Sequence, residues 1–524
     1  MIVQGRKWRG GRFGPAVAWC VCAVAAPALG GPAEEPAGLS IVVAVRITLE
    51  QQPDIRLSDQ AVEIGRGDLE VQRGAFDTSI RASVSQARDR TPLSSSQAGQ
   101  GIDQIVSDAT RYSIDLRKPL RTGLVLTPAV QMDRTDTNVP LDPESRATVW
   151  FTVSQPLIRG RGRSVAAAGE TAQGLELDAI RGERDFTISR TIVQTASAYW
   201  DYVAAIESLE IARESEQRFR RLESDMAALI EGDQIPAADI KQPRANRASR
   251  TGSTVAAEQR VFEAQQALGL AMGSPFEEIV RLPPPSDRLP EVPAASLPEP
   301  GESAPYIEQA LARRGDLVAA RARVEAAEVL VGAARNGVRP RLDLLLQAGY
   351  KGLGEGPGFG TLFSPFGDGV KGIDVGASLV VEFPPANRTA QGRLARSQAF
   401  AEQARILAAE SARAIRSSVA VAVADLSRAA RRVGIARETT ELFRSAVDDQ
   451  NQKLRLGIGT VIDLILTEDR LIQAELGEVA ARRDYAAAVV RLRFETGSLL
   501  QPSGAAQQID HATITSPPPP GAVP

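Results

Sequence analysis

Apolar residues recur along two wide stretches of this chain with the spacing of long helices. In the first stretch they step by four and three residues, and charged residues fill most positions between them. The clearest are Ile192, Ala196, Tyr199, Val203 and Ile206. This pattern indicates helices that pack along a narrow seam, as in a coiled coil. Because no proline occurs between Pro156 and Pro236, or between Pro385 and Pro502, we predict two long, uninterrupted helices.

The first of these helices is predicted from Ser164 to Ile230. At a rise of about 1.5 Å per residue it would run roughly 100 Å, several times the size of an ordinary domain core. Gly232 and Gly457 end the two long helices, and a second helix follows each of them, over residues 236–271 and 460–497. Each pair of helices is therefore predicted to form a hairpin with an exposed tip.

The two hairpins are copies of one unit. An offset of 224 residues places Asp425 on Asp201, and it also places residues 435–438 on the identical residues 211–214. The same offset still holds at Gly497, which falls on Gly273. A single offset over this span indicates an internal repeat.

Short segments before each hairpin alternate between apolar and polar residues, as strands with one apolar face do. In the second copy the apolar positions are Leu342, Leu344, Leu346, Ala348 and Tyr350, then Val375, Ala377, Leu379, Val381 and Phe383. In the first copy they are Phe76, Thr78, Ile80, Ala82 and Val84, then Val149, Phe151 and Val153. A length of about ten residues fits a tilted membrane-spanning strand and a strand of a soluble sandwich equally well.

A shorter helix precedes the strands of each copy at a different offset. Asp54 and Glu63 fall on Asp316 and Glu325, an offset of 262 residues. The first copy therefore carries 38 more residues than the second in its strand region (262 − 224). Alternating residues within 112–130 are able to form an additional hairpin there, so the number of strands per chain stays open.

The first thirty residues are predicted to be a secretory signal peptide. Its basic residues are Arg6, Lys7, Arg9 and Arg12. They precede an apolar run over residues 17–28, which is too short for an ordinary membrane-spanning helix. Both cysteines of the chain, Cys20 and Cys22, lie in this leader, so the mature protein is predicted to contain no cysteine.

Composition argues against most catalytic chemistry. The only histidine is His511, whereas zinc and copper sites and most nucleophile–base pairs use His or Cys. We therefore expect no enzyme activity, no cofactor and no metal site, with a carboxylate-pair hydrolase left as an alternative. The leader holds four basic and no acidic residues, so its removal changes the formal net charge from −3 to −7. This charge argues against a nucleic-acid partner.

Strands with one apolar face pose a closure problem, because open strand edges are not tolerated in lipid. Membrane barrels need about eight strands, so several copies of the chain would have to complete one barrel. With this architecture the chain resembles the TolC-like outer-membrane efflux protein family over residues 48–500. The matching motifs are Gln52-Pro53-Asp54, Thr152-Val153-Ser154-Gln155-Pro156-Leu157, Ala198-Tyr199-Trp200-Asp201 and the two turns that end at Asp239 and Asp463.

The resemblance implies a mainly α fold with a β-barrel part. Long coiled-coil hairpins in two tandem structural repeats would form an α-barrel, and short strands would contribute to a trimeric membrane β-barrel of twelve strands. The predicted organisation is a signal peptide (1–30), a first repeat (48–275), a proline-rich linker (276–303), a second repeat (304–500) and a disordered tail (501–524).

The implied function is a passive exit duct in the outer membrane of a Gram-negative-type cell, with helices that project into the periplasm. Such a homotrimer serves a tripartite efflux or type I secretion system, with a periplasmic adaptor and an inner-membrane transporter as partners. The helix-tip residues expected to contact the adaptor are Gly232, Ile235, Pro236, Gly457, Ile458, Gly459 and Thr460. The residues expected to form the periplasmic gate are Asp463, Leu466 and Asp239.

The gate region departs from the family's best-known pattern, whose polar positions are taken here by Leu454, Gly459 and Leu466. We therefore predict one acidic ring, made by Asp463 of three copies, and an apolar collar at Leu466, held shut more by packing than by ion pairs. Asp239 fits a helix-start carboxylate as well as a gate residue. The alternative function is a secreted or periplasmic helical adaptor or scaffold, whose strands would form a soluble domain.

Overall fold

The computed structural model describes residues 38–94, 103–139, 142–232, 240–293, 301–367, 370–456, 458–500 and 509–519. The predicted signal peptide lies outside these ranges. Within them, no helix combines the length and the apolar character that a membrane-spanning helix needs.

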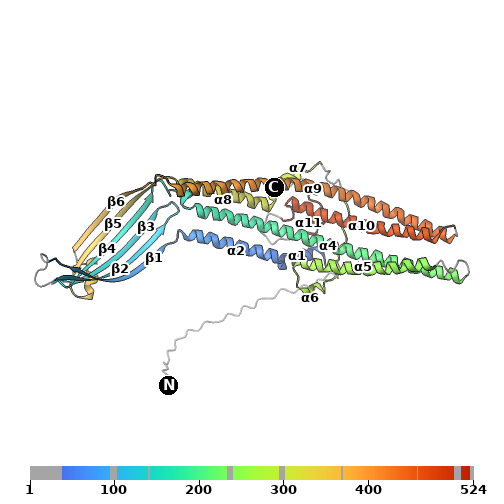
Figure 1. Ribbon diagram of the computed structural model, residues 1–524, viewed down its shortest axis with the longest axis horizontal. Helices are drawn as coiled ribbons and strands as arrows, with labels where there is room; N and C mark the ends of the chain where they lie inside the picture. Colours follow the sequence, from blue (N-terminus) through green and yellow to red (C-terminus); the bar gives the residue numbers. More distant parts are fainter. Residues whose placement is uncertain are drawn as a thin grey trace, which may run out of the picture.

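The two halves of the chain follow one order of elements, in which helices are followed by strands and then by a long helical hairpin (Figure 1). The first half consists of α1 (Ile41–Gln51), α2 (Pro53–Gly74), β1 (Ser79–Pro92), β2 (Gln104–Pro119), β3 (Val125–Thr137), β4 (Glu144–Pro156), α3 (Arg163–Ala166), α4 (Ala168–Glu231), α5 (Lys241–Met272) and α6 (Phe276–Ile279). The second half consists of α7 (Ala304–Arg313), α8 (Gly315–Gly337), β5 (Arg341–Glu355), η2 (Phe359–Leu362), η3 (Ser364–Phe366), β6 (Val370–Glu382), α9 (Arg388–Arg455), α10 (Val461–Glu495) and α11 (His511–Thr515).

The long helices dominate the molecule. α4 has 64 residues and α9 has 68, and both are free of proline, which would remove a helical hydrogen bond. The return helices α5 and α10 end alike, because Gly273 and Gly497 adopt positive φ angles of 75° and 66°. A left-handed residue at this place satisfies carbonyls of the last helical turn, and glycine adopts it without strain.

The described strands form one antiparallel sheet in the order β1-β2-β3-β4-β5-β6. The sheet lies at one end of the molecule and the hairpin tips lie at the other (Figure 1). β1 and β6 are its unpaired edges, so the sheet is open in the single chain. The predicted fold class, long helical hairpins in two repeats with strands that contribute to a barrel, is confirmed.

The number of strands corrects the expectation that the resemblance implied. Four strands per chain would give twelve in a trimer, but the described residues contain six. The additional pair is β2 and β3, which the extra residues of the first copy form. Tyr112 pairs with Met132 and Ile114 with Val130 in this pair, so the optional hairpin within residues 112–130 exists.

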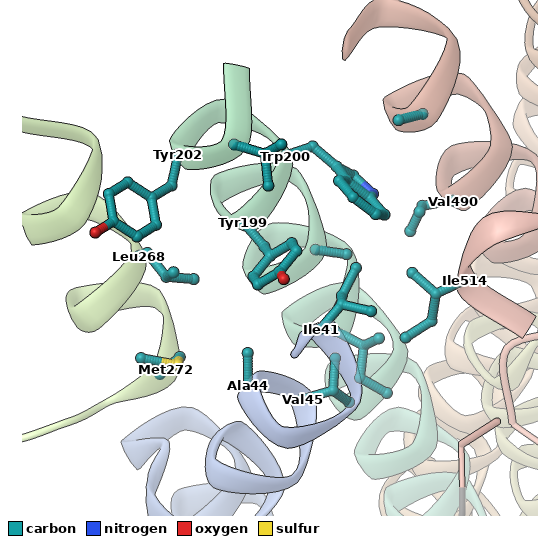
Figure 2. Close-up of a cluster of buried hydrophobic side chains, with 14 of the residues drawn as sticks. Ile41, Ala44, Val45, Tyr199, Trp200, Tyr202, Leu268, Met272, Val490 and Ile514 are labelled. Carbon is teal, nitrogen blue, oxygen red and sulfur yellow. The ribbon is translucent and has the colours of Figure 1, made fainter. Parts of the chain in front are cut away.

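The main core lies halfway along the molecule, where α1, α4, α5, α10 and α11 meet (Figure 2). Tyr199 and Trp200 are fully buried there, with their rings edge to face at 5.2 Å between centroids. Residues far apart in sequence join them, among them Ile41, Leu268 and Val490. Burial of each large apolar side chain contributes about 1.5–3 kcal/mol, so this junction is a major source of the stability of the helical part.

Polar contacts hold the start of α1 against this core. The backbone N–H of Ile41 donates to Asp287 Oδ2 at 2.7 Å, and the Tyr199 hydroxyl lies 2.9 Å from the same oxygen and 2.7 Å from the carbonyl oxygen of Leu39. Burial is the main reason that the pKa of Tyr199 is raised, so its hydroxyl stays neutral and able to donate. Residues outside the predicted repeats thus become part of the folded body.

The tail also differs from the expectation in part. We expected residues 501–524 to be disordered, but residues 509–519 are described and contain α11. Ile514 of this helix is fully buried in the main core, and Arg493 Nε donates to the carbonyl oxygen of Ser516 at 2.7 Å. The sequence did not predict this contact, because the segment is rich in proline and only a few apolar side chains, Ile509 and Ile514, attach it to the core.

Candidate functional site: the sheet faces and the hairpin tips

The register of the six strands sorts their side chains onto two unlike faces. Across one row, Ala82, Ile114, Val130, Val149, Tyr350 and Ile373 face the same side of the sheet. All apolar positions of β1, β4, β5 and β6 predicted from the alternation fall on this side, which we call the apolar face. Ile373 and Val375 are 86% and 77% exposed on it. A contiguous apolar band of this kind needs a cover of lipid or protein.

The opposite side of the sheet is polar. Arg111 of β2 donates from Nε to Asp133 Oδ1 of β3 at 2.6 Å, and Lys351 of β5 lies 2.7 Å from Asp374 of β6. The small polar residues Ser113 and Thr148 lie on the same side, in the row of strand partners that includes Lys351. This is the alternation of a barrel strand that faces lipid on one side and a water-filled lumen on the other.

The second hairpin tip places both predicted gate residues on its surface. Thr460 caps α10: its hydroxyl accepts from the backbone N–H of Asp463 at 3.1 Å and donates to Asp463 Oδ2 at 2.6 Å. Asp463 is exposed and Leu466 is 52% exposed one turn later, while Leu464 and Ile465 between them are buried. Asp463 and Leu466 thus share one side of the first turn of α10, the side that faces away from the body.

The remaining tip residues are only partly described. Ile458 is 75% exposed, and the N–H groups of Ile458 and Gly459 both donate to the carbonyl oxygen of Lys453. Gly232 closes α4 by donating to the carbonyl oxygen of Ala228. Asp239, Ile235, Pro236 and Gly457 lie outside the described residues, so the shape of the first tip stays a prediction.

A charged cluster above the tips joins the two hairpins, and sequence reasoning missed it. Arg218 of α4 donates from Nε to Glu468 Oε2 of α10 at 3.0 Å and lies 3.6 Å from Glu475. Arg250 of α5 donates to Asp469 of α10. Arg218 and Glu468 stand 250 positions apart in the chain, so no local motif marks this pairing. The contact between the two hairpins therefore includes ion pairs as well as apolar packing.

Burial gives this cluster its electrostatic character. Glu468 is 6% exposed, and desolvation raises the pKa of its carboxyl, against the opposing effect of Arg218. Phe219, Ile465 and Ile472 form an apolar patch beside it. The two hairpins are thus joined by a partly buried ion pair beside an apolar contact. Removing only one partner of such a pair lowers stability strongly, because the other charge stays buried without compensation.

A chain with one lipid-compatible sheet face, a polar opposite face and helices that continue the sheet as a long body has the architecture of an outer-membrane channel with a helical extension. Residues 306–498 match the family model described as outer membrane efflux protein.

In the part of the chain that the structure describes, no three His, Cys, Asp or Glu side chains gather as metal ligands would.

Comparison with known proteins agrees with this class. The chain is 25% identical over 438 residues to the outer membrane efflux protein BepC of Brucella suis, covering 82% of this chain and 87% of that protein. Among solved structures, it is similar to the CmeC outer membrane channel of Campylobacter jejuni, with a TM-score of 0.62, 13% identity and coverage of 93% and 92% of the two chains. The open state of the MtrE outer membrane channel of Neisseria gonorrhoeae gives a TM-score of 0.60, 17% identity and coverage of 87% and 88%.

The resemblance to the TolC-like outer-membrane efflux protein family is therefore confirmed. The predicted location in the outer membrane, with the helical part in the periplasm, and the predicted function as an outer-membrane channel are confirmed with it. The described relatives are channels and efflux proteins rather than enzymes.

Proposed function

We propose that three copies of this chain assemble into a passive exit duct for a tripartite efflux or type I secretion system. The single observation that carries the proposal is the pair of open sheet edges. β1 and β6 have no partner within the described chain, and six strands are fewer than the eight of the smallest membrane barrels. In lipid these backbone groups have to be paired, so β6 of one copy meets β1 of the next.

The helices offer a matching seam. Exposed residues on α9 recur every seven positions: Phe400, Leu407, Ala414, Val421, Arg428, Ile435 and Leu442. Exposed apolar residues with the same spacing occur on α2 and α5: Leu57, Ile64 and Val71, and Val255 and Phe262. A seven-residue repeat is the signature of a coiled-coil seam, and these residues are exposed in the described part of the single chain.

The two seams lie on opposite edges of the molecule. α9 and β6 lie along one edge, and α2, α5 and β1 along the other (Figure 1). Two different complementary edges make a head-to-tail contact, which closes into a ring when the rotation permits. Three copies would give a barrel of eighteen strands, from six per chain, and barrels of about this size leave an aqueous channel.

In this assembly the second hairpin tips converge at the periplasmic entrance. Asp463 of three copies would form an acidic ring that favours cations, and Leu466 would form the collar beside it. The exposed tips, with Ile458, Gly459 and Thr460, would contact the periplasmic adaptor, and the inner-membrane transporter would supply the energy. The duct itself would catalyse no reaction. A soluble adaptor or scaffold would leave the apolar face of the sheet in water, and no observation favours that alternative.

The test is purification of the full-length protein from outer membranes in mild detergent, with its mass determined by light scattering. We expect a trimer that conducts ions in planar bilayers. A monomer or dimer that nevertheless forms channels would contradict the trimer alone, and a species that stays soluble without detergent would overturn the duct.

A further inference from the structure

The connection from β5 to β6 folds back onto the apolar face of the sheet. We call residues 356–367, which include η2 and η3, the outer loop. The hydroxyl of Tyr350, a residue of the apolar face, donates to the carbonyl oxygen of Pro365 at 2.6 Å. Arg134 of β3 donates to the carbonyl oxygens of Pro357 and Gly358 at 3.0 and 2.9 Å. The outer loop, which connects β5 and β6, is therefore held against the sheet as far as β3, two strands beyond β5.

Small residues of the sheet make room for this contact. A Cβ atom at Gly352 would collide with the carbonyl group of Pro365, and one at Gly354 would collide with the side chain of Ser364. Beneath the outer loop, Ala147 and Ser145 of β4 are fully buried, although both belong to the apolar face by register with Gly352 and Gly354. The outer loop and the sheet are thus fitted to each other.

The position of the outer loop along the strands can be given by the rows of residues that it covers. Rows of the apolar face nearer the helices are mostly apolar, with Lys118 at the helix end of β2 as an exception. They end with the row that contains Val84, Tyr112 and Met132, and Lys371 at the β6 edge of the same row is charged. The next rows, farther from the helices, contain Arg134 and then the paired Arg88 and Asp108. The change from apolar to charged side chains marks the boundary between lipid and water on the outside of a barrel, and the outer loop sits on that boundary.

The loop turns apolar side chains outward at this height. Phe363 and Phe366 are 54% and 42% exposed, while Leu362 and Pro365 face the sheet and are buried. Residues 356–367 contain no charged side chain. Uncharged segments with exposed aromatic residues are what membrane interfaces favour.

We propose that the outer loop is an interfacial anchor, which inserts Phe363 and Phe366 among the lipids of the outer leaflet and thereby fixes the depth of the barrel. The ligand is a lipid surface, recognised by its apolar boundary rather than by a particular headgroup. This inference rests on the proposed placement of the sheet in a membrane, so its test has to separate the two.

The experiment uses nitroxide labels on single cysteines in the full-length channel, in a background with Cys20 and Cys22 replaced by alanine. The variants are Phe363→Cys and Phe366→Cys, with Val375→Cys on the apolar face and Arg90→Cys at the charged end of β1 as controls. Each is reconstituted in vesicles of phosphatidylethanolamine and phosphatidylglycerol. The collision rates of the label with oxygen, which concentrates in lipid, and with a soluble nickel chelate are measured.

We expect the labels at residues 363 and 366 to resemble the label at Val375, with frequent oxygen and rare nickel collisions. If the labels at residues 363 and 366 resemble the label at residue 90 while the label at residue 375 reports lipid, the proposed anchor is wrong and the membrane placement of the sheet stands. If Val375 also reports water, the membrane placement fails as well. Tyr350→Phe should additionally make the label at residue 366 more mobile, because it removes the hydrogen bond to Pro365; an unchanged spectrum would contradict the pinned loop.

Discussion

At the scale of single residues, Asp463 combines a local and an assembled role. Its carboxylate accepts a hydrogen bond from Thr460 and so completes the cap of α10, and at a helix start a negative charge is favourable. In the proposed trimer the same carboxylate carries the charge of the entrance ring. The two roles separate by substitution because asparagine keeps the acceptor oxygen and removes the charge.

We predict that Asp463→Asn and Asp463→Ala both lower the preference of the channel for cations, measured as the reversal potential of single channels under a salt gradient. Asp463→Ala should also lower the free energy of unfolding by about 0.5 kcal/mol more than Asp463→Asn, because it also removes the acceptor of the hydrogen bond from the Thr460 hydroxyl. If selectivity is unchanged in both variants, the acidic ring does not exist, and Asp463 is a capping residue only.

Arg218 is one of the residues that join the two hairpins. Its removal would leave the buried carboxyl of Glu468 without its nearest counter-charge, and Glu475 would keep only its contact with Arg444. Burial already raises the pKa of Glu468, so the folded state holds this proton more tightly than the unfolded state does. Ionised Glu468 therefore costs stability in the fold, and the cost appears as the pH rises through its raised pKa.

We predict that Arg218→Met lowers the free energy of unfolding on the order of 3 kcal/mol at pH 8, and by less at pH 5, where Glu468 is closer to being protonated. Thermal unfolding followed by circular dichroism over this pH range measures the difference. Glu468→Gln in the same chain should restore most of the loss. The matched control is Arg213→Met, on the same helix as Arg218. It breaks an exposed ion pair with Glu258 of α5 and should change the free energy of unfolding by about 0.5 kcal/mol or less. A loss that does not depend on pH would contradict the role of Glu468.

At the scale of elements, the long helices were the most predictable part of the fold. The helix predicted from Ser164 to Ile230 is observed as Ala168–Glu231. The prediction succeeded because an amphipathic stretch without proline has no competing structure. The strands of the apolar face followed from their alternation. β2 and β3 were harder to predict, since charged residues at positions of the apolar face, such as Asp108 and Arg134, interrupt their alternation. α11 could not be found, because only its contact with a distant core makes it a helix.

The exposed seam of α9 gives the prediction at this scale. Val421, which is 46% exposed, would be buried between copies in the proposed trimer, where a charge is costly. We predict that Val421→Glu shifts the purified protein from trimer to smaller species, measured by light scattering in detergent, with its helix content unchanged.

The control for the seam is Arg416→Gln, which changes the net charge by the same unit on an exposed position outside the seven-residue repeat. It should leave the mass unchanged. A trimer that tolerates Val421→Glu would place the contact between copies elsewhere.

At the scale of the whole molecule, the features that sequence reasoning missed are those that join distant parts. The contact of Arg218 with Glu468 links the two repeats, and the outer loop meets β3 through Arg134. Neither contact can be predicted from a short stretch of the sequence, because each joins residues far apart in the chain. The amphipathic sheet and the exposed tips, by contrast, could be predicted because they depend on local alternation and on turn residues. Asp239 and the rest of the first tip stay predictions.

The docking of α11 has a consequence for how the protein is made. Ile41 and Ile514 belong to one core, although almost the whole chain separates them, and contacts between such distant residues form slowly because a long loop has to close first. During secretion, the segment that contains Ile41 emerges long before the segment that contains Ile514. The main core therefore stays incomplete until export of the chain is nearly finished. A truncated chain that stops before α11 would reach the periplasm with part of this core exposed to water. Such an exposed apolar surface is a target for chaperones and proteases.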